Sequence, residues 1–97
     1  MRVFSKAILR EFWTKHKDCE QSLKAWFKEV EMSNWKTPHD VKKEFPKASI
    51  VANNRVVFNI NGNKYRLVVK FNYNRAWCFI KFIGTHLEYD KIDVTII

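Results

Sequence analysis

The 97-residue chain contains little glycine, proline or cysteine, and it has no long apolar run. It has two residues each of Gly, Pro and Cys, whereas hydrophobic residues make up 46% and aromatic residues 15%. So apolar a composition excludes a disordered or low-complexity chain. No segment approaches the roughly 20 apolar residues of a membrane span, and the N-terminal residues lack the apolar centre of a signal peptide. We therefore expect a single cytoplasmic domain over residues 1–97, with no membrane partner.

The residues that usually bind metals are too scattered to form a site. Cys19 and Cys78 lie far apart in sequence, outside any Cys-x-x-Cys motif, and His16, His39 and His86 lie near no cysteine cluster. Two isolated cysteines of this kind are usually buried and behave as small apolar residues. The sequence therefore predicts no metal site and no cofactor.

Acidic residues are absent from one long stretch, although the chain as a whole carries a net charge of +8. No Asp or Glu occurs between Glu44 and Glu88. A solvated surface normally mixes both signs, so this stretch indicates a binding surface for a polyanion. The alternative is a generally basic protein with a solvated face. The basic residues of the stretch are Lys47, Arg55, Lys64, Arg66, Lys70, Arg75 and Lys81.

Helical periodicity dominates the first half of the chain. After a short strand at residues 2–4, Ser5 is expected to cap a helix over residues 6–16. Asp18 is expected to cap a second helix, whose apolar stripe consists of Leu23, Trp26, Phe27 and Val30. Thr37-Pro38-His39-Asp40 predicts the start of a third, short helix that ends at Pro46.

The second half predicts an antiparallel meander of three strands. Residues 55–60 and 64–71 alternate as strands around Asn61-Gly62, a strong hairpin signal, and residues 76–83 form a third strand that ends at Gly84. In the middle strand, Tyr65, Leu67, Val69 and Phe71 share one face, which we expect to pack on the helices. Arg66, Val68 and Lys70 follow Lys64 on the other face, so this face should be basic.

Functional side chains cluster directly after the last predicted strand, in Thr85-His86-Leu87-Glu88-Tyr89-Asp90-Lys91. His86 is able to act as a general acid or base near neutral pH. Tyr89 can donate a hydrogen bond or stack on a base. Asp90 can orient a neighbour or cap a terminal turn. A basic strand beside a His/Tyr pair suits RNA backbone cleavage, in which cations stabilise the charged transition state.

These segments resemble HigB-type toxins of the RelE superfamily. The resemblance rests on Asn53–Ile60, Gly62–Lys70, Gly84-Thr85-His86 and Glu88–Lys91, and it extends to Leu9–Trp13 and Ala25-Trp26, so it covers nearly the whole chain. It implies an α+β, RelE-like fold, with N-terminal helices on one face of a small twisted antiparallel sheet and a short C-terminal turn or helix.

The resemblance also implies a function. It implies an mRNA endonuclease toxin that acts without metal, usually on the ribosome, and a helix-turn-helix antitoxin of the HigA type. The toxin–antitoxin complex would bind operator DNA. Arg66 matches the family's strand arginine, Lys81 lies where members often have Lys or Arg, and His86 and Tyr89 match the terminal motif.

Three functional hypotheses follow. In the first, the protein is an endoribonuclease in which the predicted catalytic residues are Arg66, Lys81, His86 and Tyr89. Asp90 is then an orienting residue, and the predicted RNA-binding residues are Arg55, Lys64, Lys70 and Arg75. In the second, the same cations bind nucleic acid without catalysis. In the third, the basic face only holds an acidic antitoxin segment. The role of His86 separates the first hypothesis from the other two.

Overall fold

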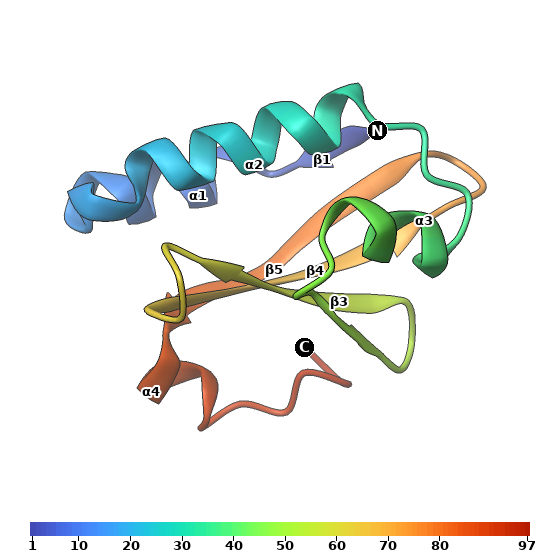
Figure 1. The fold of residues 1–97 in the computed structure, drawn as a ribbon. Helices are drawn as coiled ribbons and strands as arrows, with labels where there is room; N and C mark the ends of the chain where they lie inside the picture. The colour runs from blue at the N-terminus through green and yellow to red at the C-terminus, as the bar shows by residue number, and fades with distance from the viewer.

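A computed structural model describes residues 1–97 and shows helices packed against a five-stranded sheet (Figure 1). The predicted α+β class is confirmed. The elements in chain order are β1 (Arg2–Phe4), α1 (Lys6–Lys15), the 3-10 turn η1 (Lys17–Cys19), α2 (Glu20–Met32), α3 (Pro38–Glu44), β2 (Ser49–Val51), β3 (Arg55–Ile60), β4 (Tyr65–Asn72), β5 (Trp77–Thr85) and α4 (His86–Tyr89). No helix is long and apolar enough to cross a membrane.

The sheet contains the predicted meander and two additional edge strands. Its strand order is β1-β5-β4-β3-β2, with antiparallel pairing from β2 to β5. The prediction of a purely antiparallel sheet is wrong, because β1 pairs parallel to β5. Strand β2 was not expected, and β5 continues through Gly84 to Thr85 instead of ending there. Strand β1 confirms the strand predicted at residues 2–4, whereas β2, also three residues long, offers too little sequence pattern for prediction.

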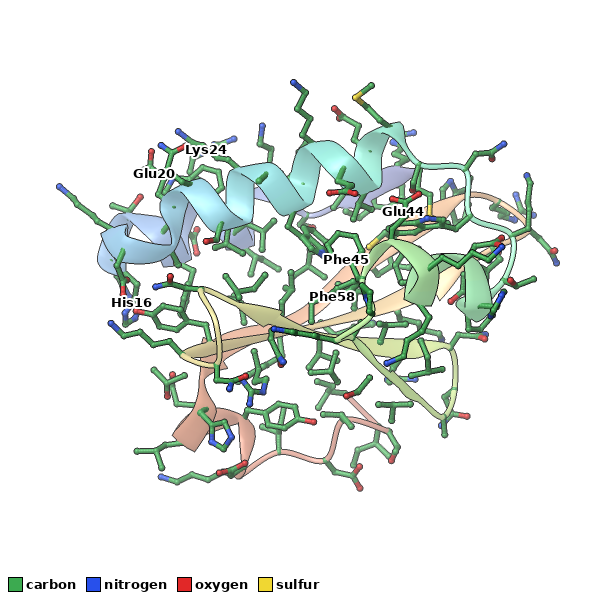
Figure 2. The ribbon with its side chains drawn as sticks, viewed as in Figure 1. His16, Glu20, Lys24, Glu44, Phe45 and Phe58 are labelled. Atoms are coloured by element: carbon green, nitrogen blue, oxygen red, sulfur yellow. The ribbon has the colours of Figure 1, made fainter.

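The main core lies between the helices and the sheet, as the alternation in β4 predicts. Leu67 and Val69 of that strand are fully buried, and Tyr65 and Phe71 are at most 2% exposed. Phe45, which follows α3, and Phe58 of β3 point toward one another between helix and sheet, with ring centroids 5.0 Å apart (Figure 2). This core orients β4, so the alternate side chains of the strand must point away from the helices.

Helix capping agrees with the sequence at one of three predicted sites. Thr37 caps α3 as predicted, and the structure adds that Asp40 completes a capping box with it. The prediction for Ser5 is wrong, because its side chain forms no capping hydrogen bond. The prediction for Asp18 is also wrong. Asp18 lies within η1, and its carboxylate accepts hydrogen bonds from Lys64 and Tyr65 of the sheet instead of capping α2.

The opposite face of the sheet is covered in part by α4 and residues 91–97, which lie on the side away from α1 and α2 (Figure 1). Two valines of this face, Val57 and Val68, are at most 3% exposed although they lie outside the main core. Arg55 donates to the backbone oxygen of Ile97, so β3 is tied to the end of this segment. The predicted basic face is therefore partly apolar and partly covered.

Candidate active site

Helix α4 carries two of the predicted catalytic residues, His86 and Tyr89, directly after β5. Thr85 caps the helix, since its hydroxyl accepts from the backbone of Glu88 and the Glu88 carboxylate accepts from the backbone of Thr85. These hydrogen bonds hold the pKa of Glu88 below its usual value. A capping box gives a helix of four residues a defined start and so fixes where His86 begins.

His86 forms a pair with Asp90 one helical turn later. The His86 Nδ1 and Asp90 Oδ2 atoms lie 3.2 Å apart, and both side chains are about half exposed. This spacing follows from the i, i+4 geometry of a helix. A carboxylate at Nδ1 holds the proton there and leaves Nε2 to exchange protons with a substrate. The predicted orienting role of Asp90 thus has a defined geometry.

Strand β4 brings Arg66 to the same end of the sheet. Arg66 pairs in register with Gly84 of β5, two residues before His86. The backbone N–H of His86 donates to the carbonyl oxygen of Lys64, at 3.3 Å. The Arg66 guanidinium is half-buried and donates to the carbonyl oxygens of Asn63 and Tyr65. Arg66 therefore lies on the strand next to the one that leads into His86.

Lys81 and Tyr89 complete the predicted catalytic set. Lys81 lies in an irregularity of β5, where the register passes from Phe82 opposite Val68 to Ile80 opposite Val69 and leaves one extra residue. Its side chain is exposed and forms no ion pair or hydrogen bond. Tyr89 is the last residue of α4 and is half-buried. Bulges re-aim side chains, and Lys81 thereby reaches solvent from a mostly apolar strand.

Lys64 is held by a network that the sequence did not indicate. Its Nζ atom lies 2.5 Å from Asp18 Oδ2, and the Tyr65 hydroxyl donates to Asp18 Oδ1 at 2.7 Å. The hydrogen bond from Lys64 lowers the pKa of Asp18 below its usual value, and that of Lys64 is raised. The His16 ring stacks on Phe12, with its Nδ1 3.5 Å from the Tyr65 hydroxyl.

No local signal could have revealed this network, because Asp18 and Lys64 are 46 residues apart in sequence. Figure 2 shows His16 at the end of α1, on the same side of the molecule as the hairpin between β3 and β4. The network joins the helix layer to the strand that carries Arg66. It thereby links the main core to the candidate site.

The other predicted RNA-binding residues lie toward the far end of the sheet. Lys70 pairs with Phe79 and with Arg55, four positions along β4 from Arg66, or about 13 Å. The expectation that Lys70 projects beside the His/Tyr pair is therefore wrong. Arg75 lies in the turn before β5 and is exposed.

Arg55 is only 8% exposed, because its guanidinium donates to the backbone oxygens of Ile97 and Asn53. With its donors directed at these carbonyls, contact with a phosphate would require residues 91–97 to move. The structure thus gives Arg55 a role in attaching the C-terminal segment to the sheet.

Both cysteines, Cys19 and Cys78, lie in the interior of the protein and are unpaired. Burial raises the pKa of each thiol, which keeps both in the unreactive neutral form. No group of three or more His, Cys, Asp or Glu side chains is placed to hold a metal ion together.

Comparison with known proteins gives consistent matches over most of the chain. Residues 19–92 match the HigB toxin family, described as the RelE-like toxic component of a toxin–antitoxin system. The mRNA interferase HigB of Escherichia coli O6:H1 is 27% identical over 94 residues, which are 95% of this chain and 91% of the relative. The mRNA interferase toxin HigB of Escherichia coli K12 is 26% identical over 92 residues, which are 93% of this chain and 88% of the relative.

Proposed function

The chain belongs to the HigB toxin family, whose members are RelE-like toxic components of toxin–antitoxin systems, and from this premise we propose that it is an endoribonuclease that inhibits translation by cleaving mRNA. The names of the relatives, mRNA interferases, support this activity. The observation that carries it is His86, whose Nδ1 faces Asp90 at 3.2 Å while Arg66 lies on the adjacent strand.

Side chains of this chain are sufficient for each proton transfer of the proposed reaction. The RNA 2′-hydroxyl loses its proton to a base, and its oxygen attacks the adjacent phosphorus. The bond from phosphorus to the 5′-oxygen then breaks, and that oxygen takes a proton from an acid. The products are a 2′,3′-cyclic phosphate and a 5′-hydroxyl. His86 is the base or the acid, and Tyr89 assists proton transfer or stacks on a base. The reaction is thus proposed to proceed without metal.

Charge stabilisation is assigned to the cations near His86. The phosphorane formed during attack carries more negative charge than the starting phosphate, so a fixed cation lowers the barrier. Arg66 is held by two backbone carbonyls at the hairpin, and Lys81 extends freely from the bulge of β5. We assign both to the scissile phosphate and assign Lys64, Lys70 and Arg75 to the RNA backbone.

Membership of a toxin family implies an antitoxin partner and, for an mRNA interferase, an RNA target. We propose further that the antitoxin is a HigA-type helix-turn-helix protein and that the complex binds operator DNA mainly through it. We also propose that cleavage takes place on the ribosome, in the cytoplasm. A chain of 97 residues has no room for a deep substrate cleft, and the ribosome would supply the missing surface.

Primer extension on mRNA from cells that express the chain tests this proposal. The wild type is expected to create new 5′ ends. His86→Ala is expected to lose them, and Arg66→Ala and Tyr89→Phe should weaken them by at least tenfold. His39→Ala is the matched control, because His39 is an exposed histidine on α3.

The outcomes separate the three hypotheses. If the wild type produces no new ends, the nuclease proposal is wrong. Ends that persist at full intensity in all three variants would show that the site lies elsewhere. If His86→Ala loses cleavage but binds RNA as the wild type does, His86 acts in chemistry and the cations act in binding.

A further inference from the structure

Three aromatic side chains gather on the sheet face opposite the helices, where β1 pairs with β5. The register sets Arg2 opposite Trp77 and Phe4 opposite Phe79. The rings of Phe4 and Phe79 stack with centroids 5.1 Å apart, and Trp77 meets them edge-on at 5.8 and 6.0 Å. We call Phe4, Trp77 and Phe79 the aromatic patch.

The three rings of the aromatic patch are less buried than the residues of the main core. All three rings are only partly buried, whereas their alternating neighbours Val3 and Cys78 pack into the main core. The sequence alone assigns no function to these residues, since β5 is apolar on both faces. Apolar side chains that are grouped on a surface and reach solvent are candidates for a binding site.

Cations surround the patch. The Arg2 guanidinium lies 4.9 Å from the centre of the Phe4 ring, and the Arg75 guanidinium lies 5.1 Å from that of Trp77. Lys70 stands opposite Phe79 in the register. None of these cations forms a salt bridge, and no acidic residue occurs between positions 44 and 88. The surface therefore combines aromatic rings with uncompensated positive charge.

We propose that the aromatic patch is a base-stacking platform for the single-stranded RNA that flanks the cleaved position, an inference that rests on the proposed function. Single-stranded nucleic acid is bound by cations that follow its phosphates and by rings on which its bases stack. An acidic protein segment would match the cations but not the rings. RNA matches both, because each nucleotide supplies a charge and a π-face.

Strand β5 connects the patch with the candidate active site. Trp77 begins this strand, Thr85 ends it, and His86 follows, so the two sites lie about 25 Å apart along one strand. Lys81 lies between them and extends into solvent. An RNA strand with its scissile phosphate between His86 and Lys81 would thus reach the patch a few nucleotides away.

Fluorescence anisotropy with a labelled 12-nucleotide single-stranded RNA of mixed sequence tests this inference. The parent protein carries His86→Ala, so that RNA stays intact. Trp77→Leu and Phe79→Leu should each weaken binding about fivefold or more, the lower end for one lost base stack. Trp77→Phe keeps a ring and should stay within about twofold of the parent. The control is Phe27→Leu, which removes a half-buried ring with Lys6 over its face on the helix layer.

Salt dependence separates stacking from charge. Trp77→Leu should lower affinity equally at each salt concentration, whereas Arg75→Ala should reduce the slope of log affinity against log salt. Unchanged affinity in both Leu variants, or no binding by the parent, would overturn the inference. Thermal melts check that each variant is folded.

Primer extension with the same patch variants, carrying the native His86, distinguishes the two proposals. If the wild type cleaves mRNA while the Leu variants bind RNA normally, the platform proposal is wrong and the nuclease proposal stands. If the wild type does not cleave, the proposed function fails first. Leu variants that keep RNA affinity but no longer bind a co-expressed HigA-type antitoxin would make the patch an antitoxin surface instead.

Discussion

The two faces of the sheet are built from the same strands but differ in the burial and charge of their side chains. On the helix side, β4 presents a continuous row of fully buried apolar side chains. On the other side, the same strand alternates Arg66, Val68 and Lys70, of which only Val68 is fully buried. The first face supplies most of the core. The second carries charges, a small apolar cluster and the aromatic patch.

This difference shows how a small chain combines stability with a reactive surface. Because side chains alternate along a strand, one row can be committed to packing while its neighbours remain available for substrate. The helix-covered row holds the backbone in place. The charged row is therefore positioned by contacts that it does not itself make.

Replacing one aromatic residue of the core should have the largest effect. Phe58 contacts Trp26, Phe45 and Phe71, and Phe58→Ala is expected to lower the free energy of unfolding by about 3–5 kcal/mol. Its neighbour Val57 points to the other face, so Val57→Ala should lower it by only about 1–2 kcal/mol. Urea denaturation measures both values. Equal losses would mean that the two faces contribute alike to stability.

Removing the charge that orients His86 should affect activity but not stability. Asp90→Asn is expected to reduce cleavage roughly 10- to 100-fold, less than the ~10⁴-fold known for a buried orienting carboxylate, because this pair is half exposed. The melting temperature should stay unchanged. Quantified primer extension gives the first value and a thermal melt the second. Asp93→Asn, a nearby carboxylate bound to Thr95, is the control and should cleave normally.

The smallest effect is expected at the junction between the two layers. The hydrogen bond from Lys64 holds the pKa of Asp18 below its unfolded value, so the ionised carboxylate stabilises the fold above about pH 4. That stabilisation is lost as the pH falls through the folded-state pKa. Asp18→Asn should thus lower the melting temperature at neutral pH, and the difference should shrink below pH ~4. Glu11→Gln, at an exposed carboxylate without a hydrogen bond, should show no such trend.

Local sequence patterns were sufficient for most elements of the fold. The apolar stripe of α2, the helix cap at Thr37 and the Asn61-Gly62 hairpin each depend on residues close together in sequence. The edge strand β2 was beyond such reasoning, and so was the parallel pairing of β1. An edge strand this short is stabilised by its neighbour in the sheet more than by its own residues.

In the candidate site, too, residues close together in sequence were predicted well, and the placement of distant residues was not. The sequence indicated His86, Tyr89 and Asp90 because they lie within a few residues of one another, and the structure adds the His86–Asp90 contact. The basic residues were predicted as one set because they share a stretch without acids. In the structure they separate, with Arg66 beside α4, Lys70 at the far end of β4 and Arg55 bound to the C-terminal segment.

The sequence by itself determined the main helices and strands, the alternation in β4 and the short polar motif after β5, since each follows from periodicity or local spacing. Only the tertiary structure decided which charges lie together. It joined Asp18 to Lys64 and assembled the aromatic patch from both ends of the chain. The physical reason is that side-chain contacts between distant segments depend on strand register and on the packing of one layer against another, and neither is encoded in any single stretch of residues.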